Sequence, residues 1–378
     1  MDTLDAAIRE AGASAYVIYA TSADPAMRYL SGFSTTDPFL YIRKPGQPGL
    51  IIISPMEYER AVRESGAEVM TRSEAGYLDY LGEEGDPWKA LARVIRERAG
   101  GDLLVPPGFP YILAQELLPA TALTVDRGAV DRMRSVKTAT EIAAIERAQR
   151  AGESALAAAR DLLRRAGKGP GGKLVDPRTN ETITSESLRS TMHRVLVSSG
   201  CRPTDTIASC GREAALPHSV GHGPVYADQP IVIDIFPQEI ATGYHADMTR
   251  TLVAGEPEEA IAEMYAAVAE AKRRAIALIR PGVTGEEVYT AVKDCFAEAG
   301  FGTGAEGFTH NLGHGVGLAI HEDPSLGPRG GELVAGNVIT VEPGLYYHTL
   351  GGVRLEDIGV VTAEGFDPLT RFEEVLCL

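Results

Sequence analysis

The chain has 378 residues, of which 44% are hydrophobic and 23% charged, and its formal net charge is −16. This length exceeds what one hydrophobic core usually supports, so we expect two domains. The composition is that of a globular protein and argues against a disordered or fibrous one. The negative charge repels polyanions, which makes nucleic acid and anionic membrane surfaces poor partners.

The sequence indicates neither export nor membrane insertion. Residues 1–5 are acidic and lack the positive flank and apolar run of a secretory signal. Apolar segments stay well below the ~18 to 20 residues that span a bilayer. The 4 cysteines lie far apart without CxxC spacing, which argues against a disulfide framework or a cysteine zinc site. We therefore expect a cytoplasmic protein with reduced thiols.

The first third of the chain alternates helical patterns with short β-branched runs. This alternation predicts an α/β domain. The expected elements are a helix at 4–11, strands at 15–19 and 50–54, a helix at 88–99 and a strand at 103–105.

The pattern changes after Val125, where a second domain is expected to begin. Thr138 and Glu141 form a capping-box sequence before a long alanine-rich helical stretch. We place the domain boundary just before this helix, which gives an N-terminal domain at residues 1–132 and a C-terminal domain at residues 133–378.

In the second domain, long helical patterns alternate with strand pairs. This arrangement predicts an α+β domain whose helices back a curved antiparallel sheet. The later elements are expected as helices at 258–279 and 284–300 and strands at 230–235, 245–253, 338–343 and 353–362. The polar stretch 176–187 is expected to be a surface insertion.

Two aspartates stand out in this domain. Asp234 interrupts the apolar run Ile231–Ile235, and Asp247 follows in the next expected strand. A buried, unpaired carboxylate is costly, so each needs a cation or donors nearby. If the two strands form a hairpin, both carboxylates can face one side and converge on one ion. Taken alone, either aspartate is better explained as an ordinary hydrogen-bonded core or turn residue.

Two glutamates show the same anomaly, because Glu342 and Glu356 also lie in apolar runs. A pair of divalent cations would explain all four acids, since carboxylates can bridge two ions. His314, in a glycine-rich segment that allows close backbone approach, would be the fifth ligand. Four carboxylates and one imidazole suit Mn²⁺, Co²⁺, Fe²⁺ or Zn²⁺ better than copper.

These residues resemble the pita-bread metallopeptidases, which include prolidase, Xaa-Pro aminopeptidase, methionine aminopeptidase and creatinase. The resemblance covers residues 133–378 and rests on motifs that occur in order: His314–Gly317, His321–Pro324, Glu342–Gly344 and Arg354–Asp357. The Arg-x-Glu-Asp form is similar to the proline-specific branch. Residues 1–132, with Tyr29–Phe33, resemble more weakly the accessory domain of prolidases and creatinases.

The resemblance implies a two-metal hydrolase that cleaves Xaa-Pro bonds at the N-terminus of small peptides, as a dipeptidase or an aminopeptidase. The two ions would be held by Asp234, Asp247, His314, Glu342 and Glu356. Mn²⁺ or Co²⁺ is expected in preference to Zn²⁺ or Fe²⁺. Asp247 and Glu356 would bridge the ions. A homodimer is also implied.

The resemblance further assigns catalytic roles. Glu342 would be the general base. His218 and His321 match positions that contact the scissile carbonyl, and His310 matches a proton shuttle. Arg354 would anchor either a substrate carboxylate or the geometry of Glu356.

The other histidines carry weaker predictions. His222 lies in the same glycine-rich loop as His218 and could substitute for it. We expect His193, His245 and His348 at surface or packing positions.

The sequence departs from the family pattern in two places. The family usually has Asp-x-Gly after the first ligand, whereas Asp234 is followed by Ile235-Phe236-Pro237, and the hairpin to Asp247 is longer. The segment Cys210–Glu213 adds charge before the substrate histidine. Both differences could alter substrate choice.

Two alternative functions stay open. A metal-free hydrolase like creatinase would need the carboxylate positions replaced, and a non-catalytic binding scaffold would have lost ligands. All five ligand positions are intact, which argues against both.

Overall fold

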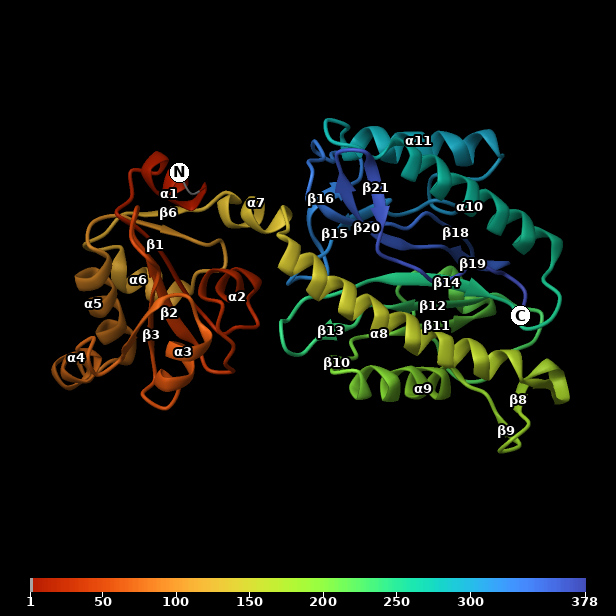
Figure 1. Cartoon of the computed structure of the whole chain (residues 1–378), viewed down its shortest axis with the longest axis horizontal. Helices are drawn as coiled ribbons and strands as arrows, with labels where there is room; N and C mark the ends of the chain where they lie inside the picture. The colour runs from red at the N-terminus through yellow and green to blue at the C-terminus, as the bar shows by residue number, and fades with distance from the viewer. Residues whose placement is uncertain (1–2) are drawn as a thin grey trace. The chain divides into compact units, whose positions relative to one another are not determined.

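The computed structural model describes residues 3–378, so Met1 and Asp2 of the acidic N-terminal segment lie outside the described residues. The chain forms two compact units, Met1–Arg134 and Ser135–Leu378, and Figure 1 labels their elements. In the part of the chain that the structure describes, no helix combines the length and apolar character needed to cross a membrane.

The first unit is an α/β domain built on a six-stranded sheet of order β4-β3-β2-β1-β5-β6. The pairs β1–β2 and β2–β3 are antiparallel, and the other pairs are parallel. Successive side chains of a strand point to opposite faces, so Tyr16 and Ile18 enter one apolar core while Ala15 and Val17 enter another. Helices cover both faces, which confirms the α/β prediction for this part of the chain.

The elements of the first unit follow in chain order: α1 (Thr3–Glu10), β1 (Ala15–Ala20), α2 (Pro25–Ser31), β2 (Phe39–Arg43), β3 (Leu50–Ile53), α3 (Tyr58–Glu64), β4 (Glu68–Thr71), α4 (Tyr77–Glu84), α5 (Pro87–Ala99), β5 (Leu103–Val105), α6 (Tyr111–Leu117) and β6 (Leu123–Val125). Helix α7 (Ala129–Ser135) ends at the start of the second unit.

The elements of the second unit are α8 (Ala139–Arg164), β7 (Gly167–Lys168), η1 (Pro170–Gly172), β8 (Leu174–Asp176), β9 (Glu181–Thr182), α9 (Ser185–Ser198), β10 (Cys201–Arg202), β11 (Ile207–Cys210), η2 (Gly211–Ala215), β12 (Ile231–Ile235), β13 (Gln238–Glu239), β14 (Met248–Leu252), α10 (Glu259–Leu278), α11 (Gly285–Glu298), β15 (Gly313–Gly315), β16 (Glu322–Leu326), β17 (Val338–Val341), β18 (Gly344–Tyr347), β19 (Gly351–Arg354), β20 (Asp357–Thr362) and β21 (Gly365–Pro368).

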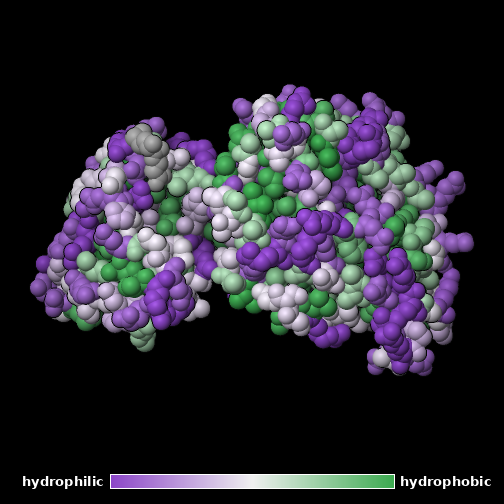
Figure 2. Space-filling model, viewed as in Figure 1, coloured by the Kyte–Doolittle hydropathy of each residue, from purple (hydrophilic) through white to green (hydrophobic). Residues whose placement is uncertain are grey.

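The second unit has α+β architecture with two helix-backed sheets. Helices α8 and α9 pack on the three-stranded sheet β11-β12-β14, and α10 and α11 pack on the strands that include β17 and β19. The capping box predicted at Thr138 is present and begins α8, and a second capping box at Thr284 begins α11. The outer face of α8 is charged, and a hydrophilic band follows it on the surface in Figure 2.

The structure differs from the sequence prediction in its strands. Antiparallel strands fall into separate sheets of order β11-β12-β14, β16-β15-β17-β20-β21 and β18-β19. The run expected as one strand at 353–362 is broken between β19 and β20, because Leu355 N–H donates to Pro343 O while Glu356 N–H donates to Thr249 O of β14. The stretch 176–187, expected to be a surface insertion, contains β9 and the first turn of α9.

Candidate metal centre

A hairpin of the second unit brings the two aspartates to one side. Strands β12 and β14 pair antiparallel, and their register places Asp234 opposite Thr249. Asp247 lies two residues before Thr249, and side chains two apart on an extended strand share a face. Ile233 and Ile235, on either side of Asp234, point instead into the apolar core under α8 and α9. The hairpin predicted from the sequence is therefore confirmed.

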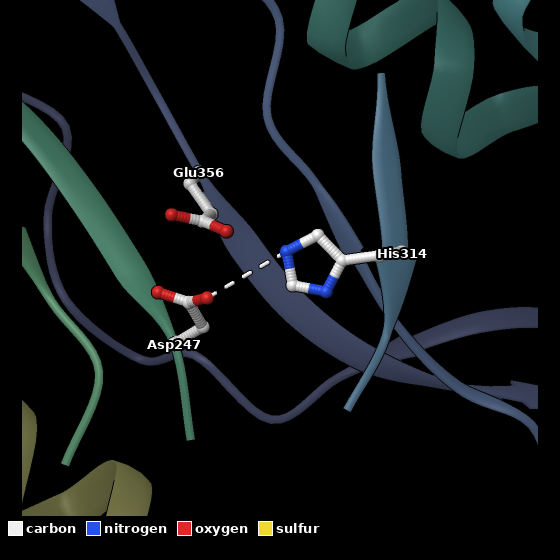
Figure 3. Close-up of side chains that lie close together, drawn as sticks. All are labelled: Asp247, His314 and Glu356. Atoms are coloured by element: carbon white, nitrogen blue, oxygen red, sulfur yellow. Dashed lines mark ion pairs between the residues drawn. The ribbon is translucent and has the colours of Figure 1, made fainter. Parts of the chain in front are cut away.

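The other acids and the histidine come from the neighbouring strands. His314 lies in β15, Glu342 directly follows β17, and Glu356 occupies the break between β19 and β20. One ligand atom from each of Asp247, His314 and Glu356 lies within 4.8 Å of the other two. Figure 3 shows both carboxylates beside the imidazole. Side chains from separate sheets thus converge on one small volume.

The His314 imidazole lies between these acids. Its Nε2 is 3.3 Å from Glu342 Oε1 and 3.8 Å from Asp247 Oδ2. A Cβ atom at Gly313 would lie 2.1 Å from the Thr340 carbonyl oxygen. Because only glycine permits so close a backbone approach, this residue lets β15 carry the histidine against β17.

Three of the acids are buried with too little positive charge around them. Asp234, Asp247 and Glu356 each have one buried carboxylate oxygen that meets no hydrogen-bond donor within residues 3–378. Burial, followed by repulsion between the acids, raises the pKa of Asp247 and Glu356 well above the usual range, and burial also raises the pKa of Asp234. A further cation would relieve both penalties.

Glu342 differs from the other acids. Burial alone would raise its pKa, but the hydrogen bond and charge of His314 outweigh burial and lower the pKa to about 2. The pKa of His314 changes in the complementary direction: burial would lower it, and Glu342 raises it above the usual value. Glu342 is therefore ionised.

Arg354 is the cation that faces the acids from β19. Its side chain is 4% exposed, and Nη2 donates to Asp234 Oδ2 at 2.7 Å. The other two nitrogens also have partners, since Nε donates to Thr249 Oγ1 at 3.0 Å and Nη1 to the Tyr346 hydroxyl at 2.8 Å. Tyr346 in turn lies 2.9 Å from His310 Nε2. Arg354 is thus committed to holding Asp234 and Tyr346.

One of the two predicted substrate histidines, His321, lies beside this centre. The His321 ring packs edge-on against His314, with 4.2 Å between the ring centroids. His218 is exposed. Burial lowers the pKa of His310 and of His321.

The other histidines differ in position. His222 Nδ1 lies 2.8 Å from Glu213 Oε1, and its side chain is 70% exposed. His348 is exposed and His193 half-buried, within the range expected for them. His245 is half-buried, and burial lowers its pKa to about 4.

Comparison with known proteins places the chain in a family. The sequence profile of metallopeptidase family M24 matches residues 143–363, more than half of the chain. The chain belongs to metallopeptidase family M24. Residues 1–136 match the creatinase/prolidase N-terminal domain, the other part of the resemblance drawn from the sequence. The α/β first unit and the pita-bread fold of the M24 unit are as predicted.

Several relatives of this M24 protein have the same extent. It is 30% identical over 356 residues to a Xaa-Pro dipeptidase from Pyrococcus horikoshii, covering 93% of this chain and 92% of the relative. Among solved structures it is similar to a Xaa-Pro dipeptidase from Bacillus anthracis, with a TM-score of 0.85, 25% identity and coverage of 100% and 98% of the two chains. A prolidase from Pyrococcus furiosus gives a TM-score of 0.81 at 26% identity, covering 98% of this chain and all of that chain.

The residues present fit the divalent ions that M24 metallopeptidases bind. Buried carboxylate oxygens that meet no donor among residues 3–378, on acids whose ionisation burial disfavours, are ligands available to a hard cation. One imidazole among them matches the mixed oxygen and nitrogen sets of first-row divalent metals.

Two sets of contacts in the M24 unit could not be predicted from the sequence. Tyr346 contacts both Arg354 and His310, and Lys137 forms a buried ion pair with Glu322 at 2.6 Å. Tyr346 lies close in the sequence to Glu342, and a tyrosine in an apolar strand is not unusual enough to be singled out. Glu322 belongs to one motif of the family resemblance, but its contact with Lys137 joins residues that are far apart in the sequence.

Proposed function

We propose that this M24 protein is a peptidase that uses two divalent metal ions to cleave Xaa-Pro bonds at the N-terminus of small peptides, as a dipeptidase or an aminopeptidase. The observation that carries the proposal is the convergence of buried acids with donor-free oxygens on His314. The proline specificity is supported by the relatives, which are named Xaa-Pro dipeptidase.

Five residues would hold the ions, which we propose to be Mn²⁺ or Co²⁺: Asp234, Asp247, His314, Glu342 and Glu356. When bound, such ions lower the pKa of a coordinated water and polarise a carbonyl oxygen. The alternatives of a metal-free hydrolase and a binding scaffold require loss of these side chains, and all five are present.

The chain's own groups would then move the proton that hydrolysis requires. A water oxygen bonds to the carbonyl carbon, the bond to the proline nitrogen breaks, and one proton passes from water to that nitrogen. The ionised Glu342 carboxylate would accept the proton and return it to the departing amine. His310, bonded to Tyr346, would relay the proton.

Neutral imidazoles would stabilise the carbonyl oxygen as negative charge develops on it. His321 packs against His314, and burial lowers its pKa, so it can donate a hydrogen bond without adding charge. His218 would approach from the exposed side of the centre. Arg354, whose donors are used within the site, would preserve the position of Asp234.

Hydrolysis of a small panel tests the proposal. Metal-stripped protein would be restored with Mn²⁺, Co²⁺ or Zn²⁺ and given Ala-Pro, Met-Pro, Ala-Pro-Phe and Ala-Ala, with bound metal counted in parallel. We expect cleavage of the proline peptides alone, and the preferred length will identify the subclass. Equal cleavage of Ala-Ala would refute proline specificity, and a protein with two bound ions that cleaves none of the panel would refute the Xaa-Pro assignment. The homodimer and the cytoplasmic location stay proposals from the resemblance and the composition.

A further inference from the structure

His218 sits on a short loop whose two ends are fixed in different ways. The loop, residues 216–222, follows η2 and is here called the His218 loop. Its first turn is held by the chain itself, because Leu216 N–H donates to Glu213 O at 3.0 Å and Ser219 N–H donates to Leu216 O at 2.9 Å. His218 therefore lies between a short helical turn and the return of the chain towards β11.

The return of the His218 loop is packed against β11. Ala208 N–H donates to Val220 O at 3.1 Å, and Arg189 Nη1 donates to Gly221 O at 2.7 Å. Gly221 has a φ of +81°, and a Cβ there would lie 2.1 Å from the Ala208 carbonyl oxygen. The loop therefore lies as close to the strand as its backbone allows.

One side chain links the two ends of the loop. Glu213, in η2, accepts three hydrogen bonds. Its Oε1 accepts from the Ser219 hydroxyl at 2.8 Å and from His222 Nδ1 at 2.8 Å, and its Oε2 accepts from the His222 backbone N–H at 3.0 Å. The Glu213 side chain is 28% exposed. Burial would raise the pKa of Glu213, but the bonds from His222 and Ser219 outweigh it and keep the pKa below its usual value.

We propose that Glu213 is a positioning residue, which closes the His218 loop and thereby fixes where His218 meets the substrate carbonyl. The inference rests on the proposed function, because His218 matters only if that carbonyl is attacked. A carboxylate suits this role better than an amide, since all its lone pairs accept and its bonds are charge-assisted.

The same geometry gives His222 a different role from that of His218. Its ring nitrogen Nδ1 lies 2.8 Å from Glu213 Oε1, so this nitrogen is used within the loop. His222 instead anchors the far end of the His218 loop to Glu213.

Substitution by glutamine gives the mildest test. In Glu213→Gln the amide nitrogen can only donate, so at least one of the three donors from Ser219 and His222 loses its acceptor. A misplacement of about 1 Å at a reacting group can cost roughly 10²-fold in rate. We expect kcat for a proline peptide to fall about 10-fold or more in Glu213→Gln and further in Glu213→Ala, with bound metal unchanged. Glu364→Gln, at an exposed turn between β20 and β21, is the matched control and should leave kcat unchanged.

A double mutant separates positioning from general damage. If Glu213 acts through His218, then Glu213→Gln should lower kcat in the wild-type background but not in the His218→Ala background. Equal losses in both backgrounds would overturn the proposal, because they would mean that Glu213 acts by another route.

Hydrogen exchange measured by mass spectrometry provides a readout that does not need activity. We expect faster amide exchange in residues 216–222 of Glu213→Gln, with no change in the buried strand β12. Unchanged exchange in the loop would overturn the proposal, even if activity fell. If wild-type protein cleaved no proline peptide, the proposed function would fail. The exchange result alone would then support or overturn the role of Glu213 in closing the His218 loop.

Discussion

A buried ion pair joins the first residues of the second unit to the strand that follows His321. Lys137 Nζ lies 2.6 Å from Glu322 Oε1, and the two side chains are only 1% and 6% exposed. Lys137 N–H also donates to Gly336 O at 2.8 Å. Replacing Lys137 with methionine preserves the apolar stem but takes the ammonium away from a carboxylate that remains buried.

The expected loss of stability follows from this burial. Removing one partner of a buried pair costs about 3–5 kcal/mol, because the other charge stays out of water. The pair Arg147–Glu239 has the same 2.6 Å separation, but Arg147 is 56% exposed. An exposed pair contributes only about 0.2–1 kcal/mol. Arg147→Met is therefore the matched control, with equal distance and different solvation.

Urea unfolding of the second unit measures the difference. The single tryptophan of the chain, Trp88, lies in α5 of the first unit, so its fluorescence follows that unit and serves as an internal reference. Far-UV circular dichroism follows both units. We expect Lys137→Met to lower the urea midpoint of the second unit, which Trp88 fluorescence does not report. The double variant Lys137→Met with Glu322→Gln should recover part of that loss of stability. A loss no larger than that of Arg147→Met would show that burial of the pair does not determine its contribution.

Three shorter predictions test the site and its surroundings. Glu356→Ala should lose bound metal, thermal stabilisation by added metal, and peptidase activity together; retention of two ions would remove Glu356 from the ligand set. Gly313→Ala should destabilise the protein by about 1–3 kcal/mol or more through its clash with β17, whereas Gly304→Ala, where nothing lies within 4 Å, should not. Burial raises the pKa of Cys210 to about 11, so only about one thiol in 10³ is ionised at pH 8. Iodoacetamide should then label the exposed Cys377 well before Cys210, and equal labelling rates would contradict the burial.

Part of the site could be predicted because the free-energy cost of burying a carboxylate is visible in the local sequence. Asp234 and Glu342 were conspicuous in the sequence, since a carboxylate in an apolar strand is unfavourable wherever that strand lies. The hairpin that pairs Asp234 with the segment of Asp247 could also be predicted, because short antiparallel connections are the commonest strand pairings. The helix start at Thr138 followed from capping chemistry within four residues.

The parts that escaped prediction depend on contacts between distant segments. The break at Glu356 arises because its N–H bonds to β14 while the strands on either side pair elsewhere. Lys137 and Glu322 approach only after β16 and the entry segment have packed. In the sequence, Glu213 was an added charge near the expected cleft. Its three hydrogen bonds come from Ser219 and His222, which reach it only in the folded His218 loop. Such pairings are set by tertiary packing, which no local pattern contains.

The charges within the centre bear on how many ions it can hold. Four carboxylates and the Arg354 guanidinium leave three negative charges in a buried volume, if His314 is neutral as a ligand must be. One divalent cation would leave the centre negative, and would oppose the negative charge that develops on the carbonyl oxygen during attack. Two divalent cations would leave it positive by one, which favours that oxygen in a site with little water to screen it. The ligand set therefore supports two ions on electrostatic grounds that are independent of the family likeness, and a protein with a single tightly bound ion at full activity would contradict this reasoning.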